Sequence, residues 1–197
     1  MSEKKTTPSP AEVLVNGFRE AKDKQAYVDG VEKAAKVATD FEFLSAVYAS
    51  GVKEFKIAQN VDKAKNFLNE GAKVGSTACM ISLADSIASE EPSKARSLLD
   101  AALTAKDMRA ANSLGVLAMR SGDVDGALAK FELAESHGVP NAANNLLVTR
   151  LQKASTVLAQ TQALLAQALR QFARPAPQAA ATEEKKSEGE KKMENID

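Results

Sequence analysis

An internal repeat constrains the fold of this chain more than any other feature of its sequence. Three stretches, beginning at Asp62, Ser93 and Asp125, align without a gap at offsets of 31 and then 32 residues. The matching positions are small or apolar: Ala64, Ala95 and Ala127; Leu68, Leu99 and Phe131; Gly71, Ala102 and Ala134; Cys79, Ala110 and Ala142; Leu83, Leu114 and Leu146. A period of about 20–50 residues is typical of solenoids, in which each unit buries its apolar face only against its neighbours.

Helical spacing and turn residues divide each unit into two helices. We expect the pairs at 61–73 with 77–89, 92–104 with 108–120, and 124–136 with 140 onward. Gly75 and Gly138 fall between paired helices, and Pro92 and Gly122 fall between units, where helices must end or begin. Asp107 and Asp123 stand where N-caps are expected. The repeat therefore predicts an all-α solenoid of antiparallel helix pairs.

Three further helices are expected before the repeats, after a polar N-terminus (1–8) that we expect to be disordered. The run Ser9-Pro10-Ala11-Glu12 has the form of a capping box with proline at the first helical position. A second helix is expected from Asp23, with an apolar stripe that extends to Ala38, and a third from about Asp40 to Ser50. A long connection follows at 51–60, and the helical-repeat domain is assigned to 9–152.

A heptad pattern occupies the C-terminal part of the chain. No glycine or proline interrupts the sequence between Pro140 and Pro175, and large apolar residues alternate there with Ala154, Thr161 and Ala168. The large residues of this seam are Leu147, Leu151, Leu158, Leu165 and Phe172. The pattern predicts a C-terminal helix over 153–173, either continuous with the preceding one or bent at 153–156. It either caps the solenoid or is coiled-coil-like and pairs with another chain, and the charged tail at 174–197 is expected to be disordered.

Composition excludes several classes of function. Lysine plus arginine and aspartate plus glutamate both number 26, so no net charge favours nucleic acid or an anionic membrane. No apolar run approaches the roughly 18–20 residues that span a bilayer, and the N-terminal residues lack the pattern of a secretory signal. The single cysteine, Cys79, excludes an internal disulfide framework. We therefore expect a cytoplasmic protein with no nucleic-acid or membrane partner.

The repeat units resemble those of the tetratricopeptide and SEL-like repeat families. The resemblance rests on LSAVYASG (44–51), DKAKNFLNEGAKVG (62–75) and LGVLAMRSGDVDGALAKFELAESHGVPNAANNLL (114–147), within about residues 41–150. The units are shorter than is usual in these families, and the second has Lys106 where its neighbours have Gly75 and Gly138. The resemblance implies an adaptor that holds a peptide or another domain in a groove lined mostly by the first helix of each pair.

No combination of residues predicts catalysis, a metal site or a cofactor. His137 is the only histidine, and its place in the last turn before Gly138 suits an interaction with helix carbonyls. Cys79 occupies a position where the other units have alanine, which indicates a packing role. The sequence shows no phosphate-binding loop, dinucleotide fingerprint or zinc-ligand spacing. We expect no catalytic residues and no enzyme.

The sequence therefore favours a non-enzymatic adaptor that binds a protein or peptide partner. The alternative is a structural scaffold that forms a homo-oligomer through the C-terminal helix. Candidate partner-binding residues are polar side chains of the repeat helices outside the apolar stripe. They are Lys65, Asn69, Lys73, Arg96, Asp100, Lys130 and Glu135, with Asn112 and Asn144 at equivalent positions of two units.

Overall fold

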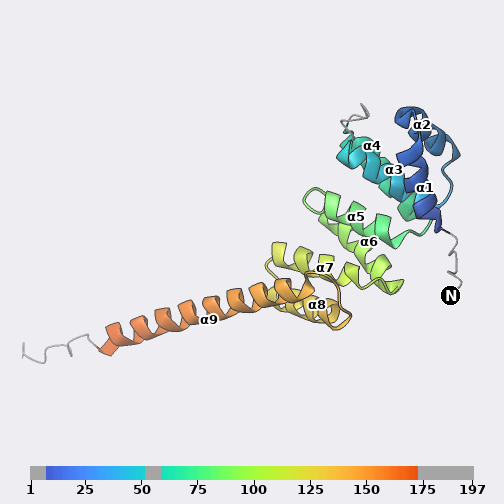
Figure 1. The fold of residues 1–197 in the computed structure, drawn as a ribbon. Helices are drawn as coiled ribbons and strands as arrows, with labels where there is room; N and C mark the ends of the chain where they lie inside the picture. Colours follow the sequence, from blue (N-terminus) through green and yellow to red (C-terminus); the bar gives the residue numbers. More distant parts are fainter. Residues whose placement is uncertain (1–7, 52–58, 173–197) are drawn as a thin grey trace, which may run out of the picture. The chain divides into compact units, whose positions relative to one another are not determined.

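The computed structural model describes residues 8–51 and 59–172, and within them it contains only helices (Figure 1). The disorder expected at the chain ends and most of the connection at 51–60 lie outside the described residues. The chain divides into two units, one up to Arg150 and one from Leu151. The helices are α1 (Pro10–Glu20), α2 (Lys24–Ala34), α3 (Ala38–Ser50), α4 (Val61–Lys73), α5 (Thr77–Ile87), α6 (Pro92–Thr104), α7 (Arg109–Arg120), α8 (Val124–Ser136) and α9 (Ala142–Phe172). The prediction of an all-α protein is confirmed for this part of the chain.

The helix starts follow their capping residues. Ser9 caps α1 in a capping box, in which Glu12 accepts from the Ser9 backbone N–H at 2.7 Å. Asn60 accepts from the backbone N–H of Lys63 at 2.9 Å and begins α4. Asp123 caps α8, whereas Asp107 stands one residue before Met108, the N-cap of α7. These local signals place most helix starts within a residue of expectation.

The second helix ends earlier than its apolar stripe predicted, because the stripe was expected to extend to Ala38. The helix α2 ends at Ala34, the backbone is extended at Val37, and α3 already begins at Ala38. The Asp40 carboxylate accepts from the backbone N–H groups of Lys36 and Val37 at 3.0 and 3.2 Å. This side chain satisfies donors at the start of α3, so the break between the two helices, expected between Ala38 and Asp40, lies a few residues earlier, at 35–37.

The first four helices enclose an aromatic-rich core. Val28 and Leu44 are fully buried, and the rings of Phe18, Tyr27 and Phe43 pack around them with centroids about 6 Å apart. Lys24 is 8% exposed, and its ammonium group donates to the carbonyls of Arg19 and Ala21 at the end of α1. A lysine stem can be buried in this way because its charged head meets helix carbonyls.

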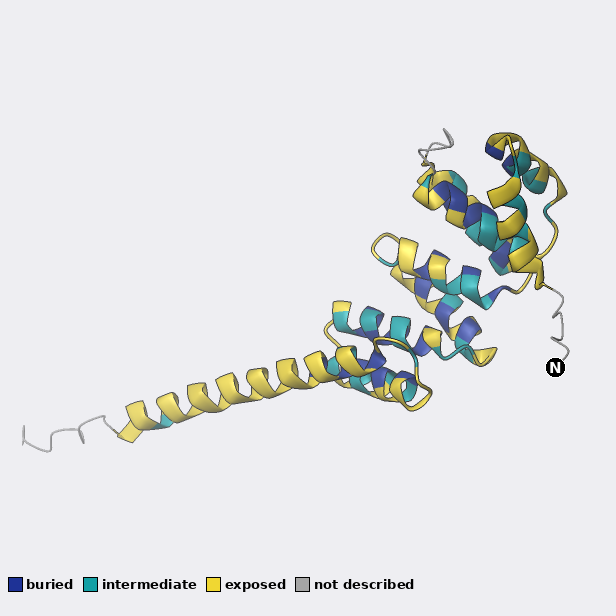
Figure 2. Ribbon diagram, in the orientation of Figure 1, coloured by how far each residue is buried: buried dark blue, intermediate teal, exposed yellow. Residues whose placement is uncertain are grey.

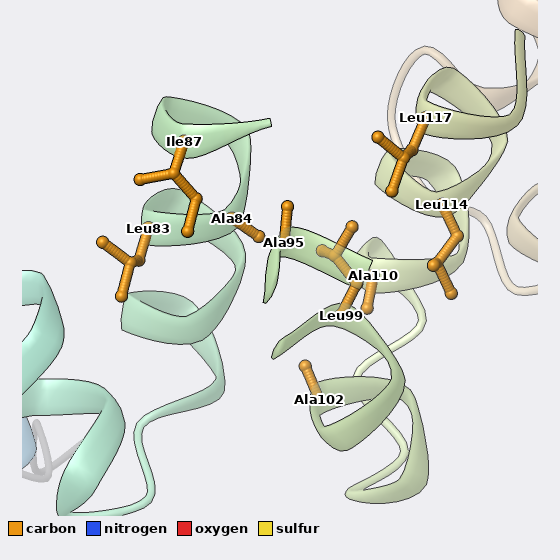
Figure 3. Packing of buried hydrophobic residues seen from close by; sticks show 9 residues of the cluster. All are labelled: Leu83, Ala84, Ile87, Ala95, Leu99, Ala102, Ala110, Leu114 and Leu117. Carbon is orange, nitrogen blue, oxygen red and sulfur yellow. The ribbon is translucent and has the colours of Figure 1, made fainter. Parts of the chain in front are cut away.

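The repeat positions form the core of the following helices. Of the fifteen matching residues, all are buried except Leu68, which is partly exposed (Figure 2). Leu83 and Ile87 of α5, Leu99 of α6, and Leu114 and Leu117 of α7 meet around small residues of the same cluster (Figure 3). The short side chains of Ala84, Ala95, Ala102 and Ala110 allow the helices to approach closely. The repeat therefore encodes helix packing.

The helices of the first unit form two layers. Each packs against the next along the chain, and α3, α5 and α7 also contact one another in sequence. Hydrogen bonds also join helices of the α3, α5 and α7 group. The Thr77 hydroxyl at the start of α5 donates to Asp107, just before α7, at 2.7 Å. The Asn145 side-chain amide of α9 donates to the Asn112 oxygen of α7 at 2.9 Å. One layer therefore contains α3, α5 and α7, and the intervening helices form the other.

The turn that follows the first helix of each repeat pair has the same backbone geometry in all three units. In α4, α6 and α8 the residue that follows the C-cap has a positive φ: Gly75 (90°), Lys106 (65°) and Gly138 (68°). The next backbone N–H then donates back to the carbonyl of Gly71, Ala102 or Ala134 at 2.9–3.1 Å. This is a Schellman closure, which satisfies carbonyls at the end of a helix. It explains the glycines of the repeat, and it shows that Lys106 adopts the glycine conformation.

The final helix, α9, is one uninterrupted element of 31 residues, Ala142–Phe172. Its first turns belong to the first unit, where Thr149 is buried and Ala142 and Leu146 pack against α7 and α8. From Leu151 to Phe172 it belongs to the second unit, which is described here by itself. Residues 153–156 are helical, so the helix has no break at the bend considered above.

Candidate functional site

A groove lies in the first unit, where the end of α5, the first turns of α6 and the end of α7 meet. Its volume is about 760 Å³. Pro92 occupies the first turn of α6, and this brings the start of α6 beside the end of α5. The groove is lined by Ala88, Ser89, Pro92, Ser93, Arg96, Ser97, Leu117, Arg120 and Ser121. Apolar atoms, hydroxyl groups and two guanidinium groups therefore share one concave surface.

A smaller hollow of about 200 Å³ adjoins this groove and has Ala88, Leu117 and Arg120 as common lining residues. It adds Asp85 of α5, together with Asn112 and Ser113 of α7. The Ser113 hydroxyl donates to the Asp85 carboxylate at 3.4 Å across the two helices. The two hollows together extend over neighbouring members of the α3, α5 and α7 layer.

The groove carries net positive charge. Arg96 and Arg120 are exposed, and neither forms an ion pair with another residue of the described chain. Loss of surrounding water raises the pKa of the Asp85 carboxyl, although the Ser113 hydrogen bond and the positive charge of Arg120 act in the opposite direction. With two arginines on its walls and one aspartate in the adjoining hollow, the groove suits an anionic group.

Two of the candidate residues from sequence lie at this site. Arg96 lines the groove. Asn112 lines the hollow, and its side-chain oxygen accepts a hydrogen bond from the Asn145 amide. Asn144, the repeat equivalent of Asn112, is exposed, and its neighbour Asn145 makes the bond between α7 and α9. Neighbouring residues of a helix point about 100° apart, so of Asn144 and Asn145 only Asn145 faces α7. The repeat alignment did not show which of the two would do so.

The remaining candidates are distributed over other parts of the helices. Lys65 lies 3.8 Å from Glu90 and Lys73 lies 2.6 Å from Glu70, so both have carboxylate neighbours. The others are exposed (Asp100, Glu135) or partly exposed (Asn69, Lys130). None of these six residues lines the groove. Arg120 does line it, although no sequence pattern selected this arginine at a helix end.

A second concave surface of about 560 Å³ lies over the turns that follow α6 and α8. It is lined by residues 105–109 and 137–140. Arg109 contacts the Asp107 carboxylate at 2.6 Å and lowers its pKa to about 2. The His137 ring Nδ1 lies 2.9 Å from the Leu133 carbonyl, in the helix-end contact expected from sequence. These interactions stabilise turns, and the charges of Asp107 and Arg109 pair with each other.

The described residues contain neither an accessible cysteine nor a cluster of metal ligands. Cys79 is fully buried, and burial raises the pKa of its thiol, which disfavours the reactive thiolate. Among the described residues no group of three or more histidine, cysteine, aspartate or glutamate side chains is placed to hold a metal ion. Within the same part of the chain, no helix has the length and apolar character needed to cross a membrane.

The apolar seam of α9 is exposed along its length. Leu147, Leu151, Leu158 and Leu165 are 58–61% exposed, and Phe172 is 88% exposed. The flanking Val157, Leu164 and Leu169 are also exposed (Figure 2). A continuous row of large apolar side chains on a helix surface marks an interaction site. The chain therefore has two candidate interaction surfaces, the groove and the seam.

The described residues contain only helices, the last of them long, and this part of the chain belongs to the all-α class. Comparison with protein-family models and with curated proteins finds no match for this sequence.

Proposed function

We propose that this chain is a non-enzymatic adaptor that binds an acidic segment of a protein partner in the groove between α5, α6 and α7. The observation that carries the proposal is the pair of exposed guanidinium groups, Arg96 and Arg120, on one groove of about 760 Å³. Binding pockets for defined ligands have volumes of about 300–1,000 Å³. The groove is therefore large enough to hold several side chains of a peptide.

The chemistry of the groove supports a carboxylate-bearing peptide. Arginine presents a planar set of donors that matches a carboxylate, and it is enriched among the residues that dominate binding energy. Ala88, Pro92 and Leu117 supply apolar contact area beside the two arginines. An acidic residue next to an apolar one would satisfy both kinds of contact at once.

The repeat architecture supports the same proposal. The stacked helices and their repeated C-terminal turns agree with the resemblance to tetratricopeptide and SEL-like units, whose grooves hold peptides or other domains. In this chain the groove and its hollow draw residues from both layers, chiefly from α6 and α7, with Asp85 of α5 and the residues that directly follow α5. The cytoplasm, which the sequence predicts, is the compartment in which we propose that this binding occurs.

Fluorescence anisotropy with labelled peptides tests the adaptor. We expect the full chain to bind peptides that carry paired glutamates next to a leucine, and to bind matched lysine peptides at least tenfold more weakly. The double substitution Arg96→Glu and Arg120→Glu should abolish the preference, because it reverses the charge of the groove. Lys73→Glu and Lys130→Glu, which lie outside the groove, form the matched control. Equal affinity for acidic and basic peptides would contradict the proposal.

Self-association through α9 is the second candidate, and the exposed seam is the observation that favours it. Five large seam residues are at least 58% exposed, so they bury little area within the described chain. Multi-angle light scattering on the full chain tests this function. We expect twice the monomer mass of 20.9 kDa for the natural sequence, and the monomer mass when Leu158 and Leu165 are both replaced by glutamine. A monomer for both proteins would exclude it.

A further inference from the structure

The seam of α9 alternates large and small residues. In heptad notation the a positions are Leu151, Leu158, Leu165 and Phe172, and the d positions between them are Ala154, Thr161 and Ala168. Every a residue is large and exposed, and every d residue is small. This alternation restricts how a second helix with the same sequence can pack against it.

In a parallel pair, a packs against a and d against d. Leucine would then meet leucine in one layer, and alanine or threonine would meet its own kind in the next. The d layers would contain unfilled space, because helices separated by the leucine layers are too far apart for alanine to close the gap. In a parallel pair, therefore, only the a layers would be well packed.

In an antiparallel pair, each a residue lies opposite a d residue of the other helix, so each layer between Leu151 and Ala168 holds one large and one small side chain. We propose that α9 pairs antiparallel with α9 of a second copy of this chain, about a centre between Ala159 and Gln160. The proposal rests on the self-association suggested above and adds its direction and register. The helices can lie close together over this span because no layer between Leu151 and Ala168 holds two large residues.

One register satisfies every layer between Leu151 and Ala168, and at each end of the pair Phe172 then lies opposite the second copy's Leu147. With this centre, Leu151 lies opposite the second copy's Ala168, Leu158 opposite its Thr161, and Leu165 opposite its Ala154. The flanking positions agree, since Val157 then lies beside the second copy's Leu164. Ser155 lies beside the second copy's Gln162 on the other side, so apolar residues meet apolar ones and polar residues meet polar ones.

The charges and the area agree with this pairing. Between Leu151 and Phe172 the charged residues are Lys153 and Arg170, which occupy the outer c and f positions. No charged side chain therefore opposes a second copy in the seam or beside it. Seven large apolar side chains on each copy, at roughly 100 Å² apiece, remove on the order of 1,400 Å² from water. This lies within the range of about 1,200–2,000 Å² found in stable interfaces.

Spin labels on the full chain measure direction and register. In a background with Cys79→Ala, single labels are placed by Gln152→Cys, Gln160→Cys or Gln167→Cys, and distances between copies are measured by double electron–electron resonance. Along the helix axis the antiparallel pair separates the two labels by about 2 Å at residue 160 and by about 22 Å at residues 152 and 167. We therefore expect the shortest distance at 160, and equal, longer distances at 152 and 167.

The outcomes separate the proposals. A dimer with similar distances at all three positions is parallel, and overturns the antiparallel arrangement while self-association stands. A dimer with unequal distances at 152 and 167 overturns the register. A monomer of 20.9 kDa overturns self-association itself and assigns the seam to a different occupant, such as a partner protein. Dimer formation that survives Leu158→Asn, with Gln160→Asn as the matched control, also overturns the proposal.

Discussion

The backbone of Gly71 lies against the sulfur of Cys79. A Cβ atom on Gly71 would collide with Cys79 Sγ and would lie 2.9 Å from Cys79 Cβ. In the other two units the equivalent positions are both alanine, Ala102 with Ala110 and Ala134 with Ala142, and all are fully buried. The first unit therefore combines a smaller residue on one helix with a larger residue on the next, and the two changes compensate.

This compensation predicts strong coupling between the two positions. Gly71→Ala alone should lower the free energy of unfolding by about 1–3 kcal/mol, because the new methyl group overpacks the site. Combined with Cys79→Ala it should restore stability or exceed that of Cys79→Ala alone, since alanine is favoured over glycine in helices by about 1 kcal/mol. Urea denaturation of the four proteins gives the coupling energy. Additive effects would contradict this account.

Gly30→Ala is the matched control for this cycle. Gly30 lies within α2, and an added Cβ there has no atom within 4 Å. The substitution should therefore stabilise the chain by about 0.5–1 kcal/mol, because nothing opposes the helix preference of alanine.

A second compensating pair joins α7 and α8. Phe131 stands where the other units have leucine, and an added Cβ on Gly115 would lie 2.5 Å from its ring. We expect Gly115→Ala to cost about 1–3 kcal/mol by overpacking, and Phe131→Leu in the same chain to remove most of that cost. Thermal unfolding of the single and double variants measures this. An equal cost of Gly115→Ala beside phenylalanine and beside leucine would show that the ring is not responsible.

Lys106 predicts a stabilising substitution. Its φ of 65° matches that of Gly138, in a conformation that costs most L-residues about 1–2 kcal/mol. Lys106→Gly should stabilise the chain by about 0.5–1 kcal/mol, since glycine adopts this φ without a steric penalty but is more flexible when unfolded. Gly138→Ala should destabilise it by a similar amount. Denaturant midpoints measure both, and a loss of stability in Lys106→Gly would mean that the lysine side chain makes a compensating contact.

Asp107 predicts a dependence of stability on pH. Hydrogen bonds from Arg109 and Thr77 lower the pKa of its carboxyl from 3.8 to about 2. A carboxyl with a lowered pKa in the folded state stabilises the fold above its unfolded pKa, and this contribution is lost as the pH falls from about 4 to about 2. Because Arg109 is exposed, we expect about 1 kcal/mol at pH 7.

Denaturation of Asp107→Asn between pH 7 and pH 2 measures this contribution. The variant should be less stable than the natural chain at pH 7, and the difference should close as the pH approaches 2. Asp100→Asn, on the exposed surface of α6, should leave stability within about 0.5 kcal/mol at every pH. A difference for Asp107→Asn that stays constant down to pH 2 would show that the charge is not the cause.

The sequence predicted the helices well because their signals are local. Ser9 and Asn60 cap helices in the structure, and the glycines at 75 and 138 adopt the positive φ that ends a helix. The break between α2 and α3 was predicted a few residues too late, because apolar spacing continues as far as Ala38. The carboxylate of Asp40, which binds the backbone there, carries no periodic signal.

The candidate site was predicted only in small part. Arg96 and Asn112 lie at the groove and its hollow, but Arg120 and the serines of the lining were not selected. Their convergence depends on how the ends of α5 and α7 meet the first turns of α6. Residues more than 20 positions apart in sequence come together there, and no local pattern records that distance.

The sequence by itself determined that the chain is helical, where most helices begin and end, and which small and apolar residues form the core. These properties follow from backbone bonding, capping and periodicity, which act over a few residues. Two relationships became apparent only in the three-dimensional structure: Gly71 and Cys79 are a matched pair, and two arginines share a groove. Those relationships depend on close packing between helices, where a shift of an ångström decides whether two atoms collide or bind.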